Sequence, residues 1–196
     1  MTDASNAPSP GFLARAFTQK LPFWYALVIS LIADLATKAW ADATVRPIAP
    51  AKIEVIPGFL AWAWAENLGA AFSIFHGKAN MLSFIALAII AGIVVFMYRA
   101  TPDRRWFILG LGFAAGGAIG NLHDRVLLGH VRDFIFFDFD LPGHTWTVTL
   151  PFRDGPLRPI PQRWPIFNVA DICIDIGVGL LMVITFFTKE KKPEGR

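Results

Sequence analysis

The sequence predicts an α-helical integral membrane protein with four transmembrane helices and small extended elements at one membrane surface. Hydrophobic residues make up 55% of the 196 residues and charged residues only 17%, whereas soluble domains average about 45–50% apolar and about 25% charged residues. The apolar residues also gather in four long runs, each near the roughly 20 residues that a helix needs to cross a ~30 Å hydrocarbon core. Composition and run length therefore agree on a membrane protein.

The four expected spans cover about residues 21–41, 81–98, 106–122 and 165–187. The first run resembles a secretory signal peptide only superficially, because it is long, contains charged residues and is followed by three more spans. We therefore expect it to remain part of the protein.

Basic residues indicate how the spans are oriented. A polar tail over residues 1–20, which we expect to be disordered, precedes the first span. A basic tail over 189–196 follows the last span, and the short loop 99–105 is rich in arginine. Short cytoplasmic segments carry an excess of Lys and Arg, so we expect one transmembrane domain over 21–188 with both termini in the cytoplasm. The basic residues form no single patch that could follow a phosphate backbone, so we expect no nucleic-acid partner.

The two outer connections contain strand-like patterns. "IEVIPGFLAWAW" at 53–64 and "HTWTVTLPF" at 144–152 alternate between apolar or aromatic residues and others, which favours short strands over helix. We expect both to form small extended elements at the outer surface. The tryptophans suited to an interfacial belt are Trp62, Trp64, Trp146 and Trp164.

Polar residues converge on the outer leaflet in this orientation. They are Asp34, Lys38, Asn67, Asn121, Asp124, Arg125, Asp133, Asn168 and Asp171. A charge inside the bilayer is costly and usually marks function. Two pairs, Asp34 with Lys38 and Asp124 with Arg125, could equally be ion pairs that only hold helices together. Asp133 and Asp171 have no obvious basic partner at helical spacing, which favours a functional role.

The pattern fits carboxylate chemistry better than the other common catalytic designs. The histidines lack metal-ligand spacing, and no nucleophile elbow or nucleotide-binding motif is present, so we expect no cofactor and no metal. Two aspartates held close share one proton, and such a pair can hydrolyse a peptide bond. The alternative is a small proton-coupled transporter or channel component, which predicts acids throughout the membrane depth and repeat symmetry.

Four ordered motifs resemble those of the lipoprotein signal peptidase family, also called signal peptidase II. They are "DLATK" at 34–38, "ENLGAAFSIF" at 66–75, "GGAIGNLHDRVLLGHVRDFI" at 116–135 and "FNVADICIDIG" at 167–177. The resemblance implies a multi-pass aspartic endopeptidase of the bacterial cytoplasmic membrane. Such an enzyme removes the signal peptide of a prolipoprotein by cutting before a diacylglyceryl-modified cysteine, near the outer (periplasmic) leaflet. We expect prolipoproteins and membrane lipid as partners, and a monomer.

The resemblance also assigns site residues. It implies that Asp133 and Asp171 are the catalytic pair, and it makes Asp124 structural, paired with Arg125. The supporting positions that it carries over are Asp34, Lys38, Asn67, Gly69, Gly117, Gly120, Asn121, Asp124, Arg125 and Asn168.

Two features depart from the family pattern. One is an apparent insertion at about 139–165. The other is Asp175, which stands where the family usually has a small or neutral residue. Either protonation through burial or a hydrogen bond to a neighbouring helix would explain Asp175.

Overall fold

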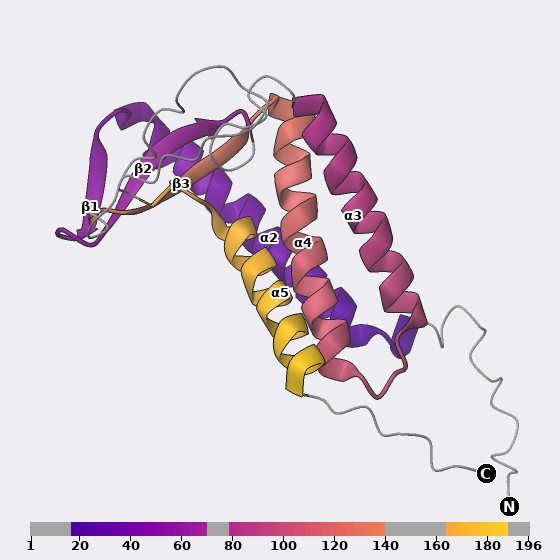
Figure 1. Cartoon of the computed structure of the whole chain (residues 1–196). Coiled ribbons are helices and arrows are strands. Elements are labelled where there is room, and N and C mark those ends of the chain that lie inside the picture. The colour runs from indigo at the N-terminus through magenta and orange to yellow at the C-terminus, as the bar shows by residue number, and fades with distance from the viewer. Residues whose placement is uncertain (1–16, 70–78, 140–163, 188–196) are drawn as a thin grey trace, which may run out of the picture.

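Four long helices and a three-stranded sheet make up the described part of the chain (Figure 1). The computed structural model describes residues 17–69, 79–139 and 164–187. Within these residues, four helices are long and apolar enough to cross a membrane, which confirms the prediction of four such helices. The helices are α2 (Leu21–Thr44), α3 (Ala79–Arg99), α4 (Arg105–Leu128) and α5 (Val169–Phe187).

Helix α4 is the centre of the bundle, and it packs against α2, α3 and α5. Glycines make these approaches possible, as the short spacing of small residues in α4 predicts. A Cβ atom on Gly112 would lie 2.4 Å from the carbonyl oxygen of Phe23 in α2, and one on Gly117 would lie 2.3 Å from that of Ala170 in α5. The backbones of α2 and α5 therefore rest directly on α4.

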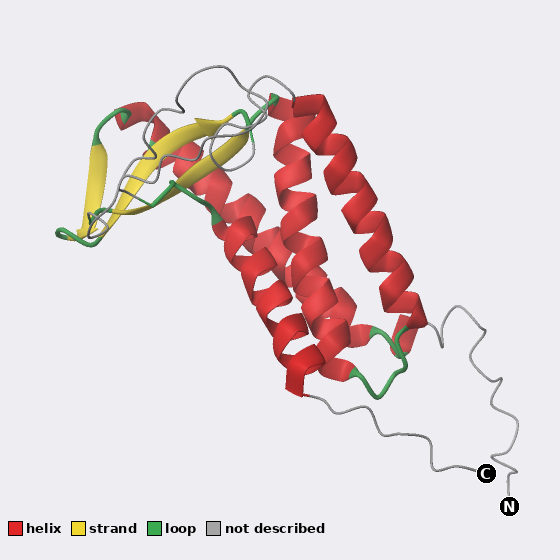
Figure 2. Ribbon diagram, in the orientation of Figure 1, coloured by secondary structure: helices red, strands yellow, loops and turns green. Residues whose placement is uncertain are grey.

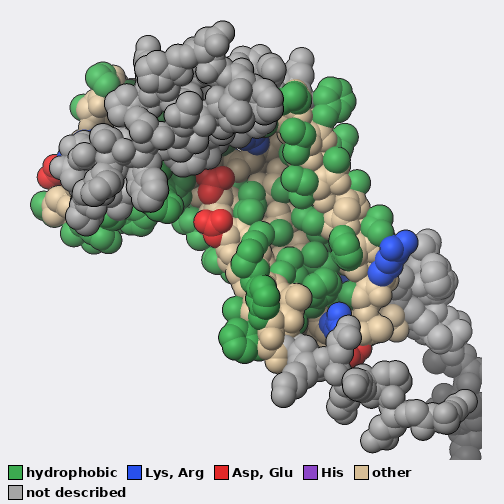
Figure 3. Space-filling view, in the orientation of Figure 1, with side chains coloured by type: hydrophobic (Ala, Val, Ile, Leu, Met, Phe, Trp, Pro, Cys, Tyr) green, Lys and Arg blue, Asp and Glu red, His purple; other side chains and the backbone are tan. Residues whose placement is uncertain are grey.

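The outward faces of the helices are apolar. Large exposed hydrophobic side chains include Ile29, Ile32, Phe84, Leu87, Phe96 and Phe186. Figure 3 shows such side chains over much of the visible bundle surface. A helix whose exposed side is apolar matches a hydrocarbon surrounding.

The sheet lies at one end of the bundle, as Figure 2 shows. Its antiparallel strands follow the order β1 (Lys52–Ile56), β2 (Leu60–Asn67) and β3 (Val131–Phe137). The β1–β2 hairpin confirms the strands predicted within 53–64, whereas β3 was not predicted. The other predicted strand, at 144–152, lies outside the described residues, as do Trp146, most of the insertion and the basic tail.

Aromatic side chains join the sheet to the bundle. Trp62 of β2 packs edge-on against Trp40 of α2 with ring centroids 5.5 Å apart, and its ring also contacts Phe134 of β3. Trp62 therefore belongs to this contact and not simply to an interfacial belt.

Helices α4 and α5 have different ends from those predicted. Helix α4 continues to Leu128 and stops at Gly129, which has the left-handed conformation (φ 78°) typical of a helix C-terminus. Helix α5 starts later than residue 165, because Phe167 is extended and exchanges backbone hydrogen bonds with Ile135 of β3. These two changes bring β3 and the start of α5 together at the sheet end, opposite the loop between α3 and α4 (Figure 1).

Candidate active site

Asp133 is buried at the junction of sheet and bundle. It lies on β3 with 2% of its surface exposed. Asn67 at the end of β2 donates from Nδ2 to Oδ2 of Asp133 at 2.9 Å, and Asn168 donates from Nδ2 to Oδ1 at 2.6 Å. Both oxygens of this carboxyl group are thus held by amide donors.

Asp171 sits in the first turn of α5 and forms a reciprocal cap with Asn168. The backbone N–H of Asp171 donates to Oδ1 of Asn168, and the backbone N–H of Asn168 donates to Oδ2 of Asp171, both at 3.1 Å. Asn168 is therefore the residue that caps α5, in the manner of a capping box. Because its side chain also binds Asp133, Asn168 links the two aspartates.

Asn121 of α4 holds the other oxygen of Asp171. Its Nδ2 donates to Oδ1 of Asp171 at 2.8 Å, while its Oδ1 accepts from Lys38 Nζ at 3.0 Å and from Asn168 Nδ2 at 3.1 Å. An ammonium group can only donate, so Lys38 fixes which end of the Asn121 amide faces Asp171.

Lys38 is completely buried between two carboxylates. Its Nζ lies 2.8 Å from Oδ2 of Asp34 and 3.4 Å from Oδ2 of Asp124. The other oxygen of Asp34 accepts a hydrogen bond from the backbone N–H of Ala170 at 3.0 Å. This ion pair therefore ties α2 to α4 and to the start of α5, and Gly120 leaves the room that the Asp34 carboxylate occupies.

Asp124 pairs with Arg132, which corrects the expected pairing with Arg125. Arg132 donates from Nε and its backbone N–H to Oδ2 at 3.1 Å and from Nη2 to Oδ1 at 2.7 Å. The Asp124 carboxylate raises the pKa of Arg132 further above its ordinary value. Asp124 and Arg132 meet because the chain turns at Gly129, which brings β3 back beside the end of α4. The sequence analysis did not identify Arg132, because it lies eight residues after Asp124 and on the other side of a turn. Gly129 could have indicated this turn, since glycine commonly follows the last residue of a helix.

Arg125 takes part in the electrostatics of the aspartates instead. Its Nη1 lies 3.4 Å from the backbone oxygen of Asn121, and its positive charge interacts with Asp171, Asp133 and Asp124. Arg125 thus provides positive charge near the two candidate catalytic groups.

The two aspartates influence each other. Burial, and then the neighbouring charge of Asp171, raise the pKa of Asp133 to about 7, against the hydrogen bonds from Asn67 and Asn168 that lower it. The two carboxyl groups come from different elements, β3 and α5, and their shared hydrogen bonds to Asn168 hold them near each other.

The expected glycines support the site in different ways. The backbone N–H of Gly69 donates to Oδ1 of Asn67 at 3.1 Å, which leaves the Asn67 amide nitrogen for Asp133. Gly117 lets α5 approach α4 beside Ala170, and Gly120 makes room for Asp34. The structure therefore brings all of the predicted site residues into one connected region.

Asp175 does not belong to this network. It lies on an exposed part of α5, and no described residue forms a hydrogen bond with it. Neither burial within the protein nor a bond to a described helix explains this acid.

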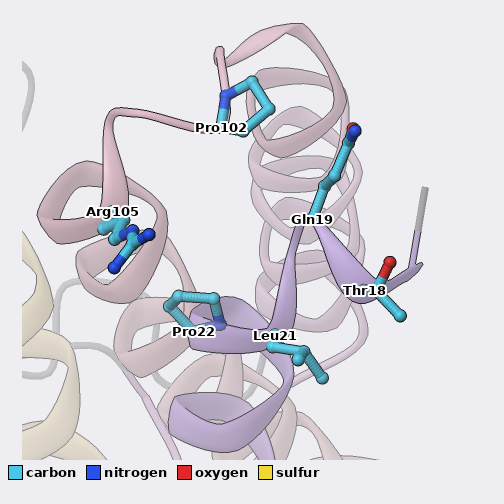
Figure 4. Close-up of a pocket in the computed structure, with 6 residues that line it drawn as sticks. All are labelled: Thr18, Gln19, Leu21, Pro22, Pro102 and Arg105. Carbon is cyan, nitrogen blue, oxygen red and sulfur yellow. The ribbon is translucent and has the colours of Figure 1, made fainter. Parts of the chain in front are cut away.

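Two further features of the described residues bear on other kinds of site. Among the residues that the structure describes, no three His, Cys, Asp or Glu side chains are grouped as metal ligands would be. A surface pocket near the loop between α3 and α4 (Figure 4) contains no acidic residue and lies at the end opposite the aspartates; it is lined by Thr18, Gln19, Leu21, Pro22, Pro102 and Arg105.

Fold and site together define a membrane protein with four spanning helices and, at one end, an amide-bound pair of aspartates, of which Asp133 is buried and Asp171 partly buried. Comparison with known proteins gives the family. Residues 26–187 match the family model described as signal peptidase (SPase) II, and the chain belongs to this family. The matches leave the transporter interpretation without support.

Individual relatives are similar in sequence to this chain over most of its length. The chain is 39% identical over 168 residues to a lipoprotein signal peptidase of Chlorobaculum tepidum, covering 85% of this chain and 94% of that protein. It is 34% identical to a lipoprotein signal peptidase of Microcystis aeruginosa, covering 87% and 96%. Two solved structures of a bacterial membrane enzyme, at 2.3 and 1.9 Å resolution, are similar with TM-scores of 0.63 and 0.64. They are 29% and 28% identical and cover 94% and 91% of this chain, and 96% of each solved chain.

Proposed function

We propose that this protein is an aspartic endopeptidase of the bacterial cytoplasmic membrane that removes signal peptides from prolipoproteins. Asp133 and Asp171 are its catalytic pair, and the cut falls before the diacylglyceryl-modified cysteine. The observation that carries the proposal is the bridge through Asn168, which joins two coupled carboxyl groups from β3 and α5. Paired carboxyl groups of this kind hydrolyse peptide bonds in aspartic proteases.

The pair divides the chemistry between its members. With a pKa of about 7, the Asp133 carboxyl group is protonated in about half of the molecules at neutral pH. Asp171 takes a proton from a water molecule, and the water oxygen attacks the carbonyl carbon of the scissile peptide bond. Asp133 gives its proton to the carbonyl oxygen.

The resulting tetrahedral carbon then loses the amine. The C–N bond breaks, and its electron pair and a proton returned by Asp171 go to the nitrogen of the cysteine. The carbonyl reforms as Asp133 takes back its proton, so that one water is consumed and both aspartates return to their starting state.

The surrounding amides keep this geometry fixed. The side-chain amides of Asn67, Asn121 and Asn168 donate to three of the four carboxyl oxygens, and the backbone N–H of Asn168 donates to the fourth. Neither aspartate therefore needs to reorient during the reaction. Lys38 locks the Asn121 amide, and Arg125 supplies positive charge as negative charge develops. These residues position the pair and the substrate backbone.

The position of the site suits a lipid-modified substrate. The aspartates lie at one end of four spanning helices, where acyl chains in the bilayer would hold the modified cysteine close to the interface. We therefore place the site near the outer leaflet, both termini in the cytoplasm, and the activity in a monomeric domain over 21–188. Membrane lipid surrounds that domain.

A reconstituted cleavage assay tests this function. The purified protein in lipid vesicles should release the signal peptide from a diacylglyceryl-modified prolipoprotein, with the new N-terminus at the modified cysteine by mass spectrometry. The unmodified precursor should be cleaved far more slowly. Equal cleavage of both precursors would contradict the lipid requirement, and inhibition of the reaction by a metal chelator would contradict the aspartic mechanism.

A further inference from the structure

Asp175 belongs to a face of α5 that the described part of the bundle does not cover. Helix α5 contacts α4 through Ala170, Ile174, Gly177 and Leu181. At 3.6 residues per turn, a second row of side chains runs beside that contact. This row, called here the open face of α5, consists of Asp171, Asp175, Val178 and Met182.

The open face begins in the site and continues into the apolar part of the helix. Asp171 is partly buried, whereas Asp175 is exposed and is followed by Val178 and Met182 with 39% and 55% of their surface exposed. Figure 3 shows acidic side chains at the bundle surface below the sheet, next to hydrophobic ones. Asp175 is thus one turn further from the sheet than Asp171, on the same side of the helix.

An exposed carboxyl group at this depth needs a polar partner. Its exposed neighbours Ile172 and Ile176 are apolar, as expected for a helix in hydrocarbon. Ionisable groups within spans are costly in lipid and normally meet a polar group of a neighbouring segment or ligand. No residue within 17–69, 79–139 and 164–187 supplies that group. The position of Asp175, one helical turn from Asp171 on the same side of α5, points to the substrate as its partner.

We propose that Asp175 is a specificity-determining residue that accepts a hydrogen bond from a serine or threonine hydroxyl of the substrate's signal peptide. This inference rests on the proposed function. Asp175 lies about 6 Å along the helix axis from Asp171, the rise of four helical residues. A signal peptide whose cleaved bond lies at Asp171 covers that distance with about four residues if helical, or about two if extended.

The hydroxyl therefore belongs two to four residues before the cut. A hydroxyl is favoured over a lysine ammonium group because it enters the hydrocarbon region at lower cost. It needs only one acceptor, which Asp175 provides whether or not the carboxyl group carries a proton.

Three lipid-modified substrates with serine at two, three or four residues before the cut test the inference, each compared with the same substrate carrying alanine. For the wild-type protein, one serine position should raise kcat/KM roughly 3- to 15-fold, the range that corresponds to single hydrogen bonds between membrane helices. In Asp175→Ala, the ratio between that serine substrate and its alanine partner should fall to about one. In Asp175→Asn, which keeps an acceptor oxygen, the ratio should stay above one.

The controls separate this contact from a general effect of polarity. Ile176→Ala changes an exposed neighbour on another side of α5 and should keep the wild-type ratio. Adding Ile176→Asp to Asp175→Ala restores an acid at nearly the same depth but on the wrong side, and the ratio should remain about one.

Three results would overturn the inference while leaving the proposed function intact: no serine preference in an active wild-type protein, an unchanged preference in Asp175→Ala, or a preference restored by Ile176→Asp. Failure of the wild-type protein to cleave any lipid-modified substrate would instead overturn the proposed function, and the inference with it.

Discussion

Replacing Gly117 by alanine places a methyl group in the contact between α4 and α5, directly beside the start of α5. The new Cβ atom would lie 2.3 Å from the backbone oxygen of Ala170 and 2.9 Å from a side-chain carbon of Ile174. Ordinary contact begins at 3.4 Å, and the obstacle at Ala170 is backbone that cannot rotate away. The two helices must therefore separate by about 1 Å at this point.

Separating the two helices should lower both the stability and the activity of the protein, and the activity should fall more. Overpacking of this kind lowers the free energy of unfolding by about 1–3 kcal/mol, and the better helix propensity of alanine offsets up to about 1 kcal/mol. Ala170 directly precedes Asp171, so the shift also moves one of the two carboxyl groups proposed to be catalytic. Misplacement by about 1 Å costs on the order of 100-fold in rate, so kcat/KM should fall far more than stability.

Thermal unfolding in detergent and cleavage of a lipid-modified prolipoprotein measure the two effects. Gly179→Ala is the matched control, because a Cβ atom there meets nothing within 4 Å, and it should be neutral or stabilising by up to about 1 kcal/mol with wild-type activity. A Gly117→Ala variant with wild-type kcat/KM would refute the argument that close packing at Gly117 positions Asp171.

Three further predictions concern the buried charges. Asp133 has a pKa of about 7 in the folded protein and an ordinary value of 3.8 in the unfolded chain, so between these pH values the folded protein binds more protons than the unfolded chain. The free energy of unfolding should therefore fall by up to about 4 kcal/mol as pH rises from about 4 to 7. Asp133→Asn should lose this pH dependence, which unfolding measured at several pH values would show. Lys38→Met leaves Asp34 unpaired in the interior and should cost about 3–5 kcal/mol in thermal unfolding, part of which the double variant with Asp34→Asn should recover. Asp124→Asn removes the negative charge from the bidentate contact with Arg132 and should lower the free energy of unfolding by about 1.5–3 kcal/mol. The variant should therefore accumulate to a lower level in the membrane, and unchanged accumulation would contradict a structural role for Asp124.

Local signals in the sequence predicted the helices and the first hairpin. Apolar runs of the right length gave the four spans, and the alternation in "IEVIPGFLAWAW" gave β1 and β2. Both depend on periodicity within a short segment, which sequence shows directly. The convergence of polar residues at one end followed from the orientation of the spans.

Features that depend on contacts between distant segments could not be predicted in this way. Strand β3 (Val131–Phe137) forms because it pairs with β2 (Leu60–Asn67), and the paired residues are about 70 positions apart in the sequence. The pairing of Asp124 with Arg132 depends on the turn at Gly129. In both cases the tertiary partner, and not the local pattern, decides the structure.

For the proposed catalytic pair, too, sequence and structure supplied different parts of the description. Sequence and family resemblance singled out Asp133 and Asp171, but the way they are joined, through the cap that Asn168 makes on α5, required the structure. The proposed role of Asp175 likewise depends on its exposed position on α5, which the sequence did not show.

The most direct test of the central claim compares cleavage of a diacylglyceryl-modified prolipoprotein by the wild-type protein, Asp133→Asn and Asp171→Asn. Asp103→Asn, in the loop at the opposite end of the bundle, is the matched control. Either site substitution should abolish cleavage while the protein still inserts and folds, and the control should cleave normally. Full activity in Asp133→Asn or Asp171→Asn would contradict the assignment of the pair.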